Sequence, residues 1–189
     1  MLFRSSRLVL IASLTFICAA FPGTPSPSLQ PSIWASQPDA VAFVKMEDEH
    51  LAETQRLLDR MLAVHEPRTL ENTLRPYDGA VRQLNSAGYL AGLMQAVHPD
   101  AAFRDRATAM VEKVGAVQTA LSLNKDVYLV LKSLDISHAD AATQHYLQRT
   151  WLAFHLAGVD KDESQRAELR KLKRSTHQSA VHLRTEYRR

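Results

Sequence analysis

Residues 100–121, DAAFRDRATAMVEKVGAVQTAL, decide the fold class of this chain. Pro99 and Asp100 open the segment, and an aspartate in this position is a good helix N-cap. Apolar side chains then recur at helical spacing, at Phe103, Ala107, Met110, Val111, Val114, Val117 and Leu121. The spacing predicts a long amphipathic helix with one face buried.

Helical patterns also precede this segment. Residues 46–65 carry one apolar stripe, formed by Leu51, Leu57, Leu58, Met61 and Leu62. Pro67 ends that helix, since the residue before a proline avoids the α region. A second helix begins near Thr69, a plausible N-cap, and continues to Val97. Pro76 lies inside it, so we expect either a kink there or a helix start nearer Pro76.

The same pattern continues towards the C-terminus. We expect a short helix over residues 126–134, then a capping box from Ser137 to Asp140 that opens a helix ending at Gly158, a left-handed C-cap. Asp160 and Glu163 form a further capping box for a last helix. Its expected apolar stripe is Leu169, Leu172, Thr176, Ala180, Leu183 and Tyr187. The predicted fold is all-α, an antiparallel array of about six helices. The last helix carries no stop signal before Arg189, which predicts an incomplete domain.

The N-terminal residues predict export. Arg4 and Arg7 precede an apolar stretch, residues 8–20, which is too short to span a membrane. We therefore expect a signal peptide over residues 1–20 and a periplasmic or secreted protein; an uncleaved N-terminal anchor is the alternative. A linker rich in proline and serine follows over residues 21–45, and the helical region covers residues 46–189. Cleavage near Ala20 would remove the single cysteine, and with it any disulfide or thiol chemistry.

Charge is nearly balanced overall but is concentrated near the end of the chain. The formal net charge is +3, while residues 161–189 hold nine Lys/Arg and four Asp/Glu. Nucleic acid is not an expected partner, because no aromatic platform is interleaved with the basic residues. The basic segment is interpreted as a solvated helix face, and the signal peptide is the expected membrane contact.

No catalytic, cofactor-binding or metal-binding residue is predicted. The eight histidines include no pair at the i, i+4 spacing of a helical zinc site; the closest, His177 and His182, are five residues apart. Serine-nucleophile, phosphate-loop and calcium-loop motifs are also absent from the sequence. The aromatic residues on the apolar stripes are expected to pack in the core; they are Tyr128, Tyr146, Trp151, Phe154 and Tyr187.

Four short motifs occur in a fixed order. They are RTLENTL at 68–74, VHPD at 97–100, LSLNKDVY at 121–128 and AGVDKDE at 157–163. Together they resemble the N-terminal helical region of the thimet-oligopeptidase-like zinc metallopeptidases, the family of oligopeptidase A and dipeptidyl carboxypeptidase. The resemblance covers residues 46–189. It implies part of the wall of a channel that admits short peptides, with the zinc site, a His-Glu-x-x-His helix, lying downstream in the family. This sequence has no such motif, so zinc is expected only in a catalytic part that this chain lacks.

Three hypotheses follow. In the first, the chain is the non-catalytic part of an exported oligopeptidase, inactive alone, whose partners are short peptides or a separately encoded catalytic part. In the second, it is a stand-alone exported helical module that binds a peptide or a protein. In the third, its basic last helix attaches to anionic surfaces.

Overall fold

A computed structural model describes residues 39–186, apart from the side chains of residues 177–178 and 181–186. The described part contains six α-helices, one short π-helix and no strand, which confirms the all-α prediction. In chain order the elements are α2 (Ala40–Leu62), η1 (Leu70–Leu74), α3 (Arg75–Val97), α4 (Ala101–Ser122), α5 (Lys125–Lys132), α6 (Ala141–Ala157) and α7 (Glu163–Glu186). The predicted signal peptide, residues 1–20, and most of the predicted linker lie outside the described residues.

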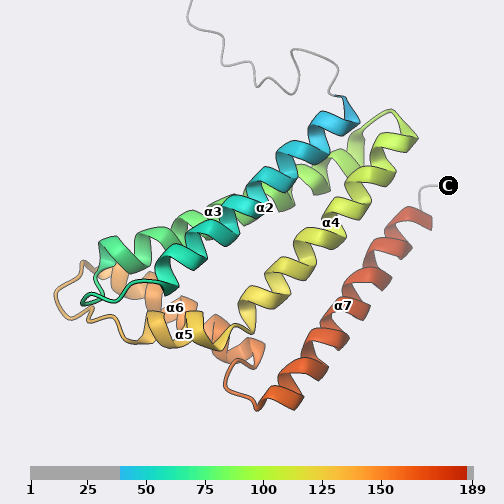
Figure 1. The fold of residues 1–189 in the computed structure, drawn as a ribbon. Helices are drawn as coiled ribbons and strands as arrows, with labels where there is room; N and C mark the ends of the chain where they lie inside the picture. Colours follow the sequence, from blue (N-terminus) through green and yellow to red (C-terminus); the bar gives the residue numbers. More distant parts are fainter. Residues whose placement is uncertain (1–38, 187–189) are drawn as a thin grey trace, which may run out of the picture. The chain divides into compact units, whose positions relative to one another are not determined.

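Helices α2, α3 and α4 form the core of the fold, with α3 antiparallel to both of the others (Figure 1). Small side chains allow the backbones to approach closely: Ala80, Ala87 and Ala91 of α3 are fully buried. Where α2 meets α4, Phe43 and Phe103 pack with ring centroids 5.0 Å apart. This packing buries the apolar stripe that the sequence of α4 predicts.

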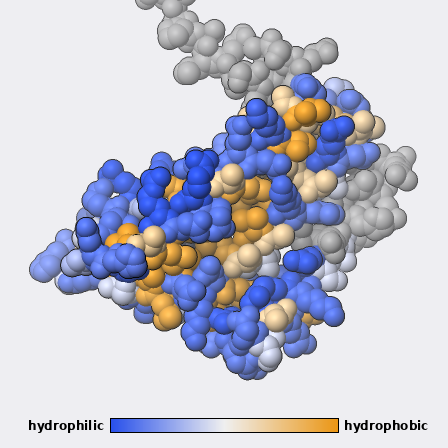
Figure 2. Space-filling view, in the orientation of Figure 1, coloured by the Kyte–Doolittle hydropathy of each residue, from blue (hydrophilic) through white to orange (hydrophobic). Residues whose placement is uncertain are grey.

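The remaining helices are held by fewer contacts. Helix α5 packs against α6 and α2, and α7 runs along α4 (Figure 1). Only Leu147 and Phe154 of α6 are buried. Figure 2 shows hydrophobic side chains gathered in a band through the middle of one face, with hydrophilic side chains on both sides.

Several predicted helix boundaries are confirmed. Thr69 forms a capping box with Asn72, and Pro76 lies in the first turn of α3, so the helix starts near Pro76, preceded by the π-helical turn. Asp100 caps α4, and its side chain accepts a hydrogen bond from the amide of Ala102. Gly158 ends α6 in the left-handed conformation, with φ of 96°.

Other predicted boundaries are wrong. Helix α2 begins at Ala40, inside the predicted linker 21–45, because the Asp39 side chain accepts a hydrogen bond from the Val41 amide and caps the helix there. The short helix predicted over residues 126–134 is present as α5 and starts one residue earlier, where Asn124 caps it. These two helices therefore start earlier than their apolar stripes indicate.

Two helices are capped by a different residue from the one that the sequence predicts. Asp140, not Ser137, caps α6, because its carboxylate accepts from the Thr143 amide. At α7 the Asp162 carboxylate accepts from the Gln165 amide, while Asp160 lies 3.5 Å from His155.

The predicted apolar stripe of the last helix is largely unburied. Leu169 is half-buried, but Leu172 is 56% exposed, and Thr176 and Ala180 are also exposed. The side chains of Leu183 and Tyr187 lie outside the described part of the chain. The stripe is largely exposed because α7 meets the core through α4 alone among its close neighbours.

One carboxyl group lies inside the core. Glu47 of α2 is fully buried, and neither of its carboxyl oxygens has a hydrogen-bond partner among the described residues. Burial, and to a lesser extent the charge of Asp48, raise the pKa of Glu47 to about 7. Asp48 itself pairs with Lys113 of α4, at 2.6 Å. The ionised form of Glu47 is therefore disfavoured in the fold.

Candidate functional site: a cleft beside α6

Helix α6 stands off from α3 and leaves a cleft between them. The closest backbone neighbours of α6 are α5 and α4. The gap towards η1 and α3 forms two cavities, of about 480 Å³ and about 360 Å³. Tyr146 lines both cavities, so we treat them as one α6 cleft. Cavities of this size hold small ligands or short peptide segments.

The two halves of the α6 cleft differ in character. The larger cavity lies between the start of α3 and the start of α6, where Glu71, Arg75 and Asp78 contribute charged groups. The smaller cavity has an apolar wall that includes Tyr77, Leu84 and Phe154. Polar side chains on its border come from α3, α4 and α6; they are Asn85, Gln118, Ser122, Tyr146 and Thr150. An apolar pocket with a few convergent polar groups is the usual form of a ligand site.

Aromatic rings organise the smaller cavity. The ring of Phe154 lies 6.3 Å from that of Tyr77 and 5.9 Å from that of Tyr128, in tilted arrangements typical of aromatic pairs. The hydroxyl of Tyr146 lies 3.5 Å from Oδ1 of Asp78. The phenol of Tyr146 therefore links the apolar wall to the charged half of the cleft.

The two tyrosines of the cleft stay neutral at ordinary pH. Burial raises the pKa of Tyr77 well above its usual range, and the nearby Tyr146 and Asp78 add to the effect. Burial also raises the pKa of Tyr146, with the negative charge of Asp78 as the next cause. Both hydroxyls are thus neutral hydrogen-bonding groups and not bases.

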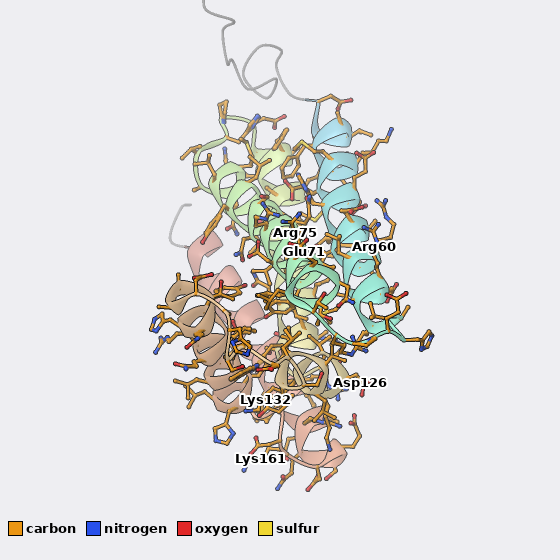
Figure 3. The ribbon with its side chains drawn as sticks, turned by 90° about the vertical axis from the view of Figure 1, so that its left-hand side faces the viewer. Arg60, Glu71, Arg75, Asp126, Lys132 and Lys161 are labelled. Carbon is orange, nitrogen blue, oxygen red and sulfur yellow. The ribbon has the colours of Figure 1, made fainter. Side chains whose placement is uncertain are left out.

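Charged groups lie at both ends of the α6 cleft. At the η1 end, Arg75 and Glu71 form an ion pair of 3.0 Å, and Figure 3 shows their side chains beside each other. At the opposite end, Nζ of Lys173 from α7 lies 3.5 Å from Oγ of Ser122 and 3.5 Å from the carbonyl oxygen of Ala157. A compensated pair therefore lines one end of the cleft, and a cation lies beside Ser122 at the other.

A second hollow lies between α2 and α3, with a volume of about 710 Å³. Arg60, Arg75 and Arg82 border it, and Figure 3 places Arg60 on the α2 side. Two of these arginines are already paired with carboxylates one helical turn away, Arg75 with Glu71 and Arg82 with Asp78. Because all three arginines are exposed and two of them are compensated, the hollow has the character of a solvated surface.

The histidines occupy separate places. Nδ1 of His50 lies 2.5 Å from Oε1 of Gln83, the ring of His98 stacks on Phe103 at 3.8 Å, and His155 lies near Asp160. Within residues 39–186, no group of three His, Cys, Asp or Glu side chains is arranged to hold a metal ion.

The predicted core aromatics have a mixed outcome. Phe154 is buried, as predicted, but Tyr128, Tyr146 and Trp151 are only half-buried. Lys132 lies over the Trp151 ring, 4.4 Å from its centroid. No signal in the sequence indicates that Tyr146 lines a cleft, because its place on the apolar stripe is the same whether α6 touches α3 or stands off from it.

No helix in the described range has the length and apolar composition needed to cross a membrane.

Comparison with models of known protein families gave no match for this chain. Comparison with curated proteins gave no match either. The resemblance drawn from the four motifs therefore stays a prediction.

Proposed function

We propose that this chain is a non-catalytic helical part of an exported zinc-dependent oligopeptidase, a channel-wall segment that contacts short peptides in the α6 cleft. The observation that carries the proposal is the cleft itself, whose smaller cavity combines an apolar wall with uncharged hydrogen-bonding groups. Such a lining suits a peptide, whose side chains and amide groups need both kinds of contact. Zinc belongs, in this proposal, to a catalytic part outside this chain.

The roles of the motif residues support a scaffold. Thr69 and Asn72 of the first motif form a capping box, and Asp100 of the second caps α4. Asn124 of the third motif caps α5, and Gly158 of the fourth ends α6. Each motif thus sets a helix boundary, which is the role expected of channel-wall residues.

Exposed apolar side chains favour a part of a larger assembly over a stand-alone module. Tyr89, Leu93 and Val97 follow one another at four-residue intervals on α3 and are 78%, 45% and 58% exposed. Leu156 of α6 is 76% exposed. An apolar stripe of this kind usually faces another surface.

Peptide binding is the test of the proposal. Fluorescein-labelled short peptides added to the purified full chain should show a saturable rise in anisotropy, with no cleavage in the presence of zinc. Ala153→Trp should abolish binding, because Ala153 is an exposed residue that lines the cleft. Leu152→Trp, at the neighbouring exposed position outside the cleft lining, is the matched control and should bind normally.

Three results would count against the proposal. Absence of binding would remove the peptide role, and equal loss in both tryptophan variants would place any peptide elsewhere. Chelator-sensitive cleavage by a clean preparation would mean that the chain carries its own active site.

The alternative, a stand-alone exported module, predicts different solution behaviour. A self-sufficient domain should melt in one sharp, reversible transition that does not depend on concentration. A part that exposes its partner-facing stripe should instead aggregate or melt broadly. Following helicity on heating at several protein concentrations distinguishes the two.

A further inference from the structure

The ammonium group of Lys173 lies beside Ser122, a residue at the border of the smaller cavity, and it has no carboxylate partner among the described residues. Ser122 lines this cavity, and its hydroxyl accepts from Nζ of Lys173 at 3.5 Å. The other acceptor of Lys173 is the carbonyl oxygen of Ala157, also neutral and also at 3.5 Å. Among the described residues no carboxylate lies within 4.0 Å of this ammonium group.

Three other basic residues of α4 and α7 are paired with carboxylates. Lys113 pairs with Asp48, and both Arg166 and Arg170 pair with Glu163. Lys173 is half-buried, and the oxygens that approach it among the described residues are neutral, as they also are for Arg104 at the start of α4. The negative end of the α6 dipole offsets part of its charge. An anionic group at this point would form a charge-assisted hydrogen bond in a partly desolvated place.

The lining of the cavity indicates which class of molecule would bear the anionic group. Its wall is apolar and its volume, about 360 Å³, lies near the small end of the range for ligand pockets, roughly 300 to 1,000 Å³. Asn85 and Gln118 border it, and both side chains are exposed, so water can reach their amides when the cavity is empty. An alkyl chain would cover these amides without pairing them, which costs free energy, whereas a peptide group can bond to them.

We propose that this cavity binds the C-terminal residue of a short peptide, with an apolar side chain against Tyr77, Leu84 and Phe154 and the terminal carboxylate on Lys173. The inference rests on the proposed peptide-binding function and adds to it a preference for peptides with a free, apolar C-terminus. Lys173 then acts as a specificity-determining residue supplied by α7 to a cleft formed by α3, α4 and α6.

The test compares one peptide in two forms. A fluorescein-labelled tetrapeptide ending in leucine, as the free acid and as the C-terminal amide, is titrated with the full chain and followed by anisotropy. The free acid should bind about tenfold or more tightly than the amide, because only the acid can form the charged hydrogen bond. Exchanging the last leucine for aspartate should remove binding, because the wall is apolar.

Substitutions assign the effect to Lys173. Lys173→Met should weaken the acid to the level of the amide and leave the amide unchanged. Lys171→Met, an exposed lysine on the same helix, is the matched control and should behave as the unmodified chain. Circular dichroism of both variants should match that of the parent.

Each other outcome is decisive. Equal binding of acid and amide would overturn the carboxylate site and leave the proposed peptide function standing, while failure of both peptides to bind would count against both proposals. Equal weakening of both forms by Lys173→Met would mean that Lys173 only holds α6 in place. Displacement of the peptide by octanoate at similar concentration would overturn the assignment to a peptide terminus.

Discussion

Two groups of helices in this chain pack differently. Helices α2, α3 and α4 form a close-packed half, and α6 and α7 form a looser half. The first three meet through fully buried alanines and a tilted phenylalanine pair, so their backbones come close. Helix α6 buries two side chains and leaves a cleft, and α7 leaves most of the described part of its stripe exposed. Small side chains at a helix interface permit close packing; where large rings hold helices apart, space for a ligand remains. The cleft is thus a consequence of the loose packing of α6 against α3.

The largest expected effect separates these two halves. Phe103→Ala should destabilise the fold by about 3–5 kcal/mol, because Phe103 is 2% exposed in the close-packed half. Phe154→Ala should cost less, near the lower end of that range at about 3 kcal/mol, because Phe154 borders a cavity and has fewer partner atoms on that side. Chemical denaturation of both variants measures the difference. Equal costs would contradict the contrast between the two halves.

The second effect tests the interior of the close-packed half. Since burial raises the pKa of Glu47 from 4.5 to about 7, the folded state holds this proton where the unfolded state has lost it. The contribution of Glu47 to the free energy of unfolding should therefore be largest below about pH 4.5. It should fall by about 3 kcal/mol as the pH rises to about 7, and then level off.

Denaturation at a series of pH values checks this expectation in two variants. Glu47→Gln should remove the fall, because a neutral amide does not titrate. Glu49→Gln, at an exposed position on the same helix, should keep it. A Glu47→Gln variant with the parent's pH dependence would show that Glu47 titrates normally.

The third and smallest effect concerns the junction of α6 and α7. Gly158 has φ of 96°, and a Cβ there would lie 2.6 Å from Cδ1 of Leu169. Gly158→Ala should therefore cost about 2 kcal/mol, from the left-handed backbone and the displaced leucine.

Gly92 provides the matched control for this junction. It lies inside α3, and no neighbouring side chain or helix comes within 4 Å of the position that a Cβ would take. Gly92→Ala should therefore stabilise the fold by up to about 1 kcal/mol. Thermal melts of both variants give the comparison. A neutral Gly158→Ala would mean that α7 is not held against Gly158.

Much of the secondary structure was predictable because its signals are local. Thr69, Asp100 and Gly158 act through groups a few residues away, so their roles follow from sequence spacing. The wrong caps, Ser137 and Asp160, each lie two or three residues before the aspartate that caps the helix, Asp140 and Asp162. Choosing between neighbouring caps depends on how the loop approaches the helix, which the local pattern does not specify.

The cleft was not predictable from the same signals. Tyr146 and Phe154 occupy the apolar stripe of α6 whether or not a cavity lies beside them. Lys173 is one of several basic residues on its helix, and only its position beside Ser122 and Ala157 sets it apart. These relations join α3, α4, α6 and α7, and no sequence spacing contains them.

Local signals in the chain specify that it is helical from Met46 onward, where several helices start and stop, and which side chains form the apolar stripes, because propensity, capping and periodicity act over a few residues. Tertiary packing, in contrast, selects which stripes are buried, places Glu47 inside the core, and holds α6 away from α3 to leave a cleft beside Lys173. Those outcomes depend on the distances between helices, and these are set by the shapes of side chains that meet from distant parts of the chain.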